Sequence, residues 1–240
     1  VVTYGEDPST WASVFQTAIN AISPPLRRVG VEPRRLRMLE LRLLESALPS
    51  ERFVPAEDLI AELRMIKDAA ELAALRKAVE IAEQALQATL THLKLGMTEA
   101  ELAAELTLQI LRHGSESNLP FAPVVACGEN SANPHHVPSG RALQLGDLLL
   151  FDWGATYQGY VSDLTRTFAV GSIDPELIHI AQVVLEANHA ARLKAAPGVP
   201  AGEVDCAARQ VIEAAGYGSY FTHRLGHGYG LEEHEPPYLR

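Results

Sequence analysis

The chain repeats itself weakly at an offset of 102 residues. Four identities fall within a window of 19 positions, and they pair Gly96 with Gly198, Glu101 with Glu203, Ile110 with Ile212, and Gly114 with Gly216. The paired residues hold matching places at the caps and ends of predicted helices, which strengthens the match. We infer that one unit of helix, helix and strand is duplicated. We expect the strands of the second unit to begin near Tyr220.

Helix signals mark both units. In the first, we predict a long helix from Asp58 to Leu95, with Gly96 as its C-cap residue. Thr98 and Glu101 then form a capping box, which predicts a second helix as far as about His113. In the second unit, apolar spacing predicts helices over residues 175–196 and from there to about 215, separated by a Pro-Gly break.

The first 60 residues have a different pattern. Asp7 and Pro8 are a typical helix start, and the stretches RRVGVE (27–32) and ERFVPA (51–56) are predicted strands on either side of a helix. This alternation is typical of an α/β domain but is too short for a core of its own. We therefore expect residues 1–60 to be the C-terminal part of such a domain, and 61–240 a second domain. The first residue is Val1, so we expect an N-terminus that is processed, trimmed or missing.

Composition excludes several classes of partner. The formal net charge of the 240 residues is −10, and an acidic chain repels phosphate backbones, so nucleic acid is not an expected partner. The sequence has no apolar run near 18 residues, so we expect no membrane partner. Two cysteines do not make a disulfide framework and do not indicate an oxidising compartment. We expect a cytoplasmic protein.

Two carboxylates lie in a predicted hairpin, LLLFDWGATYQGYVSDLTRTFAV (148–170). A turn centred between Tyr157 and Gln158 would place Asp152 directly opposite Asp163 on one face, with Cβ atoms ~5 Å apart. Like charges so placed repel, and two interpretations remain open. Either the register differs or a strand is bulged and exposed, or the pair binds two metal ions ~3.5–4 Å apart.

Neighbouring polar residues extend the second interpretation. A metal-binding carboxylate needs hydrogen-bond donors around it, and Thr165, Arg166 and Thr167 are candidates. His135 and His136 lie in the loop SANPHHVPSGR just before the hairpin. A loop histidine alone is usually only exposed, so these two form a weak signal.

The segment THRLGHGYGLEEHEPP (222–237) carries three more histidines, His223, His227 and His234. Its alternating glycines disfavour a helix and suit an extended backbone that another group approaches closely. Three glutamates here, at positions 232, 233 and 235, could be ligands, but such a run is more often a solvated edge.

Taken together, PHH, GDLLLFDWGATYQGYVSDLTRTFAVG and HRLGHGYGLEEHEPP resemble the pita-bread metallopeptidases, in the branch of Xaa-Pro aminopeptidases and Xaa-Pro dipeptidases (prolidases). The resemblance runs from about residue 60 to the end, and the preceding AELRMIKDAAELAALRKA resembles the segment entering that catalytic domain. It implies an α+β pita-bread fold, with two pseudo-symmetric units around a curved antiparallel sheet. Residues 1–60 resemble the end of the family's α/β N-terminal domain.

The resemblance also implies roles for six residues. Asp152 would be a terminal metal ligand, Asp163 a bridging ligand and His227 a ligand of the second metal. The substrate side would hold His135, with His223 and His234 contacting substrate and stabilising the tetrahedral intermediate. The implied cofactor is two divalent metal ions, with manganese, cobalt, iron and zinc left open.

The family uses two further glutamates, one bridging the metals and one acting as general base, on strands that would follow Arg240. We therefore expect the 240-residue chain alone to bind metal poorly and to turn over little. The implied substrate is a peptide with proline at its second position, dipeptide or longer, and the full-length protein is expected to be a homodimer. Two alternatives stay open: a metal-free hydrolase resembling creatinase, and a non-catalytic binding module on the same fold.

Overall fold

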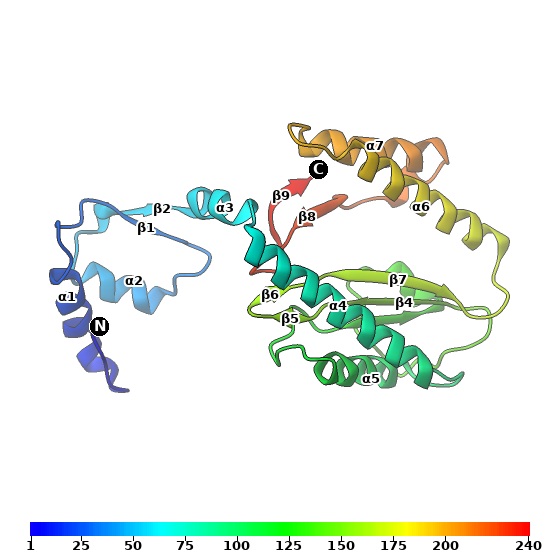
Figure 1. The fold of residues 1–240 in the computed structure, drawn as a ribbon, viewed down its shortest axis with the longest axis horizontal. Coiled ribbons are helices and arrows are strands. Elements are labelled where there is room, and N and C mark those ends of the chain that lie inside the picture. The colour runs from blue at the N-terminus through cyan, green and yellow to red at the C-terminus, as the bar shows by residue number, and fades with distance from the viewer. The chain divides into compact units, whose positions relative to one another are not determined.

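The computed structural model describes residues 1–50 and 52–240 of the chain (Figure 1). They form two compact units, residues 1–64 and 65–240. No helix among the described residues is long and apolar enough to cross a membrane.

The first unit is a short α/β segment. Its elements are η1 (Pro8–Thr10), α1 (Trp11–Asn20), β1 (Val29–Val31), α2 (Met38–Glu45), η2 (Ser50–Arg52), β2 (Phe53–Pro55) and α3 (Glu57–Met65). Both predicted strands are confirmed, and they pair in parallel with Val29 opposite Phe53. The predicted helix start is confirmed too, because the Asp7 side chain accepts a hydrogen bond from the backbone N–H of Ser9.

The second unit contains two helix pairs and the main sheet. Its elements are α4 (Ala69–His92), α5 (Glu99–Arg112), β3 (Val124–Cys127), η3 (Gly128–Ala132), β4 (Leu148–Trp153), β5 (Thr156–Tyr157), β6 (Tyr160–Val161), β7 (Leu164–Ala169), α6 (Pro175–Lys194), α7 (Ala201–Ala214), η4 (Gly218–Tyr220), β8 (Gly226–Gly228) and β9 (Glu235–Leu239). The strand order β3-β4-β7 is antiparallel throughout. Helices α4 and α5 lie along one face of this sheet (Figure 1).

The duplication is confirmed. Moving the bounds of α5 by 102 residues gives the bounds of α7, and moving the first residue of β3 gives the first residue of β8. The glycines that follow α5 and α7, Gly114 and Gly216, both have positive φ, at 102° and 87°. The first strand of the second repeat starts six residues later than expected, because Tyr220 lies in the short helix η4.

The predicted long helix over residues 58–95 is wrong, because the chain breaks between α3 and α4. Asp68 caps α4 by accepting hydrogen bonds from the N–H groups of Ala70 and Glu71, and the Glu71 carboxylate accepts from the Asp68 N–H. This capping box starts a new helix. Helix α4 ends at His92, so Gly96 lies in the following turn with a φ of 88°.

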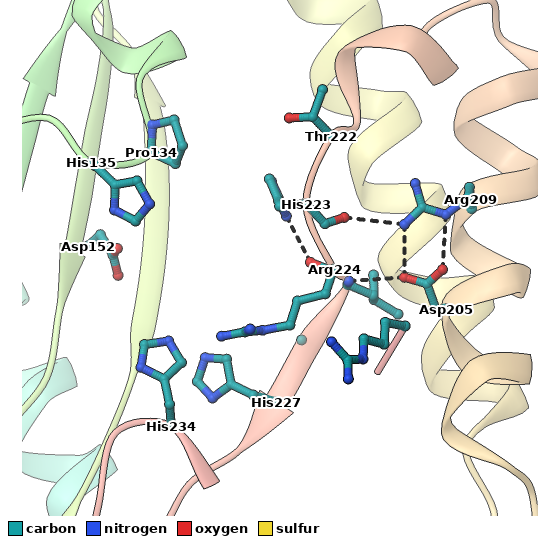
Figure 2. A pocket seen from close by; sticks show the side chains of 13 residues that line it. Pro134, His135, Asp152, Asp205, Arg209, Thr222, His223, Arg224, His227 and His234 are labelled. Carbon is teal, nitrogen blue, oxygen red and sulfur yellow. Dashed lines mark hydrogen bonds and ion pairs between the residues drawn. The ribbon is translucent and has the colours of Figure 1, made fainter. Parts of the chain in front are cut away.

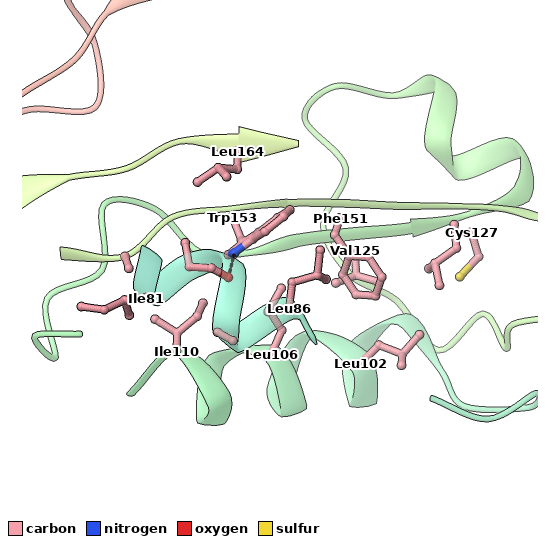
Figure 3. Packing of buried hydrophobic residues seen from close by; sticks show 14 of the residues in the cluster. Ile81, Leu86, Leu102, Leu106, Ile110, Val125, Cys127, Phe151, Trp153 and Leu164 are labelled. Carbon is pink, nitrogen blue, oxygen red and sulfur yellow. Dashed lines mark hydrogen bonds between the residues drawn. The ribbon is translucent and has the colours of Figure 1, made fainter. Parts of the chain in front are cut away.

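The core lies between the sheet and the helix pair α4–α5 (Figure 3). Trp153 is 1% exposed, and its indole N–H donates to the Ala82 carbonyl oxygen at 2.9 Å, which fixes β4 against α4. In β4 the buried side chains alternate with Leu148, Leu150 and Asp152 on the opposite face. Packing of the apolar face therefore turns the Asp152 carboxylate away from the core.

The predicted register of the hairpin is wrong by two residues. Asp152 pairs with Thr165, and the same register continues through the N–H of Ser162, which donates to Ala155. The two-residue turn is Gln158-Gly159, with φ values of 50° and 77°, which is the type I′ turn that suits a twisted hairpin. A shift of two residues keeps side chains on the same face, so Asp163 lies diagonal to Asp152 rather than directly opposite.

Candidate active site

All six residues that the resemblance singles out lie around two overlapping cavities, and Figure 2 shows the five that line the larger one. The larger, of about 880 Å³, is lined by His135, Asp152, His223, His227 and His234. The smaller, of about 430 Å³, shares four of these residues and adds Asp163. The hairpin, the loop before it and the segment around β8 that runs from His223 to His234 thus bring these side chains together.

The Asp152 carboxylate is in an unfavourable electrostatic setting. Burial is the main reason that its pKa is raised to about 6, and the negative charge of Asp163 raises it further. The Thr165 hydroxyl opposes this by donating to Asp152 Oδ1 at 3.0 Å. Burial also raises the pKa of Asp163. Two carboxylates held this way are stabilised by a cation placed between them.

His227 presents a bare nitrogen to Asp163. Its Nδ1 lies 3.0 Å from the carbonyl oxygen of Gly228, which can only accept, so Nδ1 carries the hydrogen. In the neutral ring Nε2 then has a lone pair, and it lies 3.4 Å from Asp163 Oδ2. Two electron-rich atoms facing each other need a proton or a metal ion between them. A backbone carbonyl that orients an imidazole in this way is typical of metal-ligating histidines.

Two further histidines stand beside this pair. The rings of His234 and His227 have centroids 4.1 Å apart, and burial is the main cause that lowers the pKa of His234. His223 is oriented like His227, because its Nδ1 lies 2.8 Å from the carbonyl oxygen of Arg224.

The donors predicted to support the carboxylates are confirmed in part. Thr165 contacts Asp152 as expected. The prediction is wrong for Arg166, whose guanidinium donates to the carbonyl oxygen of Thr165 and lies 3.9 Å from Glu83. Arg166 is on the strand face opposite to Thr165, so it points away from the carboxylates.

The glutamates after β8 do not form the solvated edge that their spacing suggested. Glu235 is 3% exposed, and it accepts hydrogen bonds from the N–H groups of Leu231 and Glu232 while pairing with Lys67 Nζ at 3.3 Å. It therefore closes the loop that carries His234. Glu233 lines the smaller cavity and contributes to the raised pKa of Asp152.

The close approach predicted for the glycines of this segment is found at Gly228 and not at Gly226. A Cβ atom on Gly228 would lie 2.5 Å from the carbonyl oxygen of Pro236, so the backbone of β9 passes too close for a side chain. This approach is what lets β8 and β9 pair while His227 faces the cavity.

Two carboxylates and one imidazole nitrogen are the types of ligand that divalent metal ions bind in proteins. The described residues nevertheless contain no group of three or more His, Cys, Asp or Glu side chains close enough to hold a metal ion. These three candidate ligands are thus fewer and farther apart than the donors of a complete site for such an ion, which takes at least four.

Comparison with known proteins identifies the family to which the chain belongs. The profile of metallopeptidase family M24 matches residues 73–240, and that of the Creatinase/Prolidase N-terminal domain matches residues 1–66. The chain belongs to metallopeptidase family M24. The predicted α+β pita-bread fold and the branch are therefore confirmed, since the solved structures of similar fold include an X-Pro aminopeptidase and an Xaa-Pro dipeptidase.

Among these M24 relatives, YkvY of Bacillus subtilis is 35% identical over 237 residues, which cover 99% of this chain and 65% of YkvY. The Xaa-Pro dipeptidase of Pyrococcus horikoshii is 42% identical over 185 residues, covering 77% of this chain and 52% of that protein. The crystal structure of the X-Pro aminopeptidase of Thermotoga maritima superposes with a TM-score of 0.87 at 34% identity, covering 99% and 66% of the two chains. The chain therefore spans about two-thirds or less of the length of these relatives.

Proposed function

We propose that this M24 chain is the part of a metal-dependent Xaa-Pro peptidase that contributes Asp152, Asp163 and His227 as metal ligands. The observation that carries the proposal is the meeting of His227 Nε2 with Asp163 Oδ2 beside the buried Asp152 carboxylate. The two buried carboxylates are unfavourable in the metal-free protein, and a cation between them and the imidazole would stabilise their charged form.

Two divalent metal ions, when bound, would supply a water molecule of lowered pKa and would polarise the carbonyl of the scissile bond. The carboxylates and one imidazole suit manganese, cobalt, iron and zinc, and do not decide among them. Thr165 would hold the Asp152 carboxylate in its orientation, and the Gly228 carbonyl would hold the His227 ring.

His135, His223 and His234 would act on the substrate. A Xaa-Pro bond has no N–H, so the enzyme must recognise the ring by shape and deliver a proton to the leaving nitrogen. The three histidines border the cavity that also contains Asp152 and His227, which supports this role (Figure 2). His223 Nε2 is the nitrogen free to meet a substrate, because Nδ1 is bonded to the backbone.

The relatives support the substrate class, since the protein from Pyrococcus horikoshii is named an Xaa-Pro dipeptidase and that from Thermotoga maritima an X-Pro aminopeptidase. The two names leave open whether the substrate is a dipeptide or a longer peptide. We also propose that residues 1–60 belong to the α/β N-terminal domain, residues 61–240 to the catalytic domain, and that the complete protein is a homodimer.

The test is hydrolysis by the complete native protein of Ala-Pro, Ala-Ala and Ala-Pro-Ala after loading with Mn²⁺ or Co²⁺. Cleavage of Ala-Pro with little cleavage of Ala-Ala supports the proposal, and the tripeptide separates dipeptidase from aminopeptidase. Equal cleavage of Ala-Pro and Ala-Ala contradicts the proline preference. Activity that persists without any divalent metal favours the creatinase-like alternative, and no activity with bound metal favours the binding module.

A further inference from the structure

Glu99, the first residue of α5, has a completely buried carboxylate with an unusual number of partners. It accepts five hydrogen bonds, all from one stretch of chain: from Cys127 N at 2.7 Å, Asn130 Nδ2 at 2.9 Å, His136 Nε2 at 2.8 Å, Ser139 N at 3.0 Å and Ser139 Oγ at 2.6 Å. We call residues 127–139 the His135 loop. One carboxylate thus joins both ends and the middle of this loop.

The Glu99 carboxylate is held in its charged form. Burial acts to raise its pKa, but the hydrogen bonds, with that of Ser139 the largest, outweigh burial and lower the pKa to about 2. Its place at the start of α5 adds the favourable end of the helix dipole. A charged carboxylate is only an acceptor, so each of the five donors has a definite direction.

The loop is tied to the same helix by its backbone. The N–H of Glu99 donates to the carbonyl of Arg141, and the N–H of Ala100 donates to the carbonyl of Ser139. His135 itself is exposed, and its N–H donates to the Asn133 side chain at 3.0 Å. Its position therefore depends on the anchored residues on either side, Asn130 and His136, rather than on burial of its own ring.

The second repeat contains a similar arrangement around His223. Asp205 of α7 is 6% exposed, and it accepts from the N–H of Leu225 at 3.0 Å and pairs with Arg209. Arg209 in turn donates to the carbonyl oxygens of Phe221 at 3.0 Å and His223 at 3.2 Å. In each repeat, a buried carboxylate on the second helix thus holds the segment that carries a histidine of the cavity.

The two carboxylates do not correspond in the repeat. Moving Glu99 by 102 residues gives Ala201, whereas Asp205 would correspond to Ala103. The duplicated helix therefore anchors the histidine segment in both repeats, but through different residues. Equivalent arrangements built from different positions point to a shared requirement, the placement of the histidine.

We propose that Glu99 is a positioning residue for His135, acting through the His135 loop, and that Asp205 with Arg209 positions His223. The inference rests on the proposed function in one respect, since that function assigns His135 and His223 to the substrate. A carboxylate that only stabilised the fold would act on catalysis equally with and without His135.

The first experiment is hydrogen–deuterium exchange of the complete metal-free protein, comparing wild type with Glu99→Gln. The matched control is Glu101→Gln, a carboxylate two residues away that accepts hydrogen bonds from the N–H and the hydroxyl of Thr98 in the capping box. We expect the backbone N–H groups of residues 128–133 and 135–137 to exchange at least tenfold faster in Glu99→Gln only, with those of α4 unchanged. Unchanged exchange in the loop, or equal acceleration throughout the protein, overturns the proposal.

Should Glu99→Gln not fold, Ser139→Ala takes its place, because it removes one of the five donors and leaves the carboxylate. We expect it to raise loop exchange about threefold. Loop exchange equal to that of wild type in this variant overturns the proposal. Neither result depends on activity, so both stand even if the proposed function fails.

The second experiment is a double-mutant cycle on kcat/KM for Ala-Pro. We expect Glu99→Gln to lower kcat/KM at least tenfold with His135 present, and less than twofold in the His135→Ala background. An equal loss in both backgrounds overturns the positioning role. Absence of Ala-Pro cleavage by the wild type contradicts the proposed function instead, and the exchange experiment then decides the positioning.

Discussion

Asp163 Oδ2 lies 3.4 Å from His227 Nε2, although the two residues are 64 positions apart in the chain. Asp163 lies between β6 and β7 in the hairpin of the first repeat, and His227 lies at the centre of β8 in the second repeat. The ligands of the proposed metal site thus come from both halves of the duplication.

The first prediction concerns Asp152 in the metal-free protein. Its pKa in the folded state is about 6, above the value of 3.8 of an unperturbed carboxyl, so the folded state binds more protons than the unfolded state between these values. Stability therefore falls as the pH rises from about 4 to 6. We expect Asp152→Asn to stabilise the metal-free protein at pH 7 by on the order of 1–2 kcal/mol.

Urea denaturation at pH 7 and pH 4 measures this effect, with EDTA present. The gain in free energy of unfolding should be large at pH 7 and close to zero at pH 4, where the wild-type carboxyl is protonated. A destabilised Asp152→Asn at pH 7 would contradict the electrostatic account of the site.

The second prediction concerns Thr165. Replacing it with valine removes the hydroxyl that donates to Asp152 and leaves a side chain of similar shape. We expect the affinity for Mn²⁺ to fall roughly tenfold, since loss of an outer hydrogen bond commonly costs ~10–100-fold. Thr167→Val is the matched control on the same face of β7, and its Mn²⁺ affinity should equal that of wild type by calorimetry. Equal losses in both variants would refute a specific role for Thr165.

The third prediction concerns the buried pair Lys67–Glu235. The side chains are 12% and 4% exposed, so Lys67→Met leaves a buried carboxylate without its cation. We expect a loss of roughly 3 kcal/mol in the free energy of unfolding. Lys77→Met breaks an exposed pair with Glu80 and should cost less than about 0.5 kcal/mol. Similar losses for the two variants would show that Glu235 does not depend on Lys67.

Local signals in the sequence predicted much of the fold. The capping box of Thr98 and Glu101 is present with both of its hydrogen bonds, and the repeat at 102 residues correctly relates α5 to α7. Each of these features is a short-range preference that tertiary packing reinforces. The capping box at Asp68 carries the same kind of signal and was missed because the apolar pattern continues across it.

Features that depend on distant partners were not predictable from the sequence. The hairpin register depends on positive φ at both Gln158 and Gly159, and a glutamine at such a position gives little warning. Glu99 and Glu235 look like surface carboxylates in sequence, because the donors to Glu99 lie at least 28 residues away and Lys67, which pairs with Glu235, lies 168 residues away. Their burial reflects those partners and not local propensity.

The most direct measurement of the central claim is the metal dependence of Ala-Pro hydrolysis in the complete native protein and in Asp163→Asn. The account predicts that chelation abolishes hydrolysis, that added Mn²⁺ or Co²⁺ restores it, and that Asp163→Asn loses at least a hundredfold in kcat/KM together with its bound metal. Hydrolysis that survives both chelation and the Asp163→Asn substitution would contradict it.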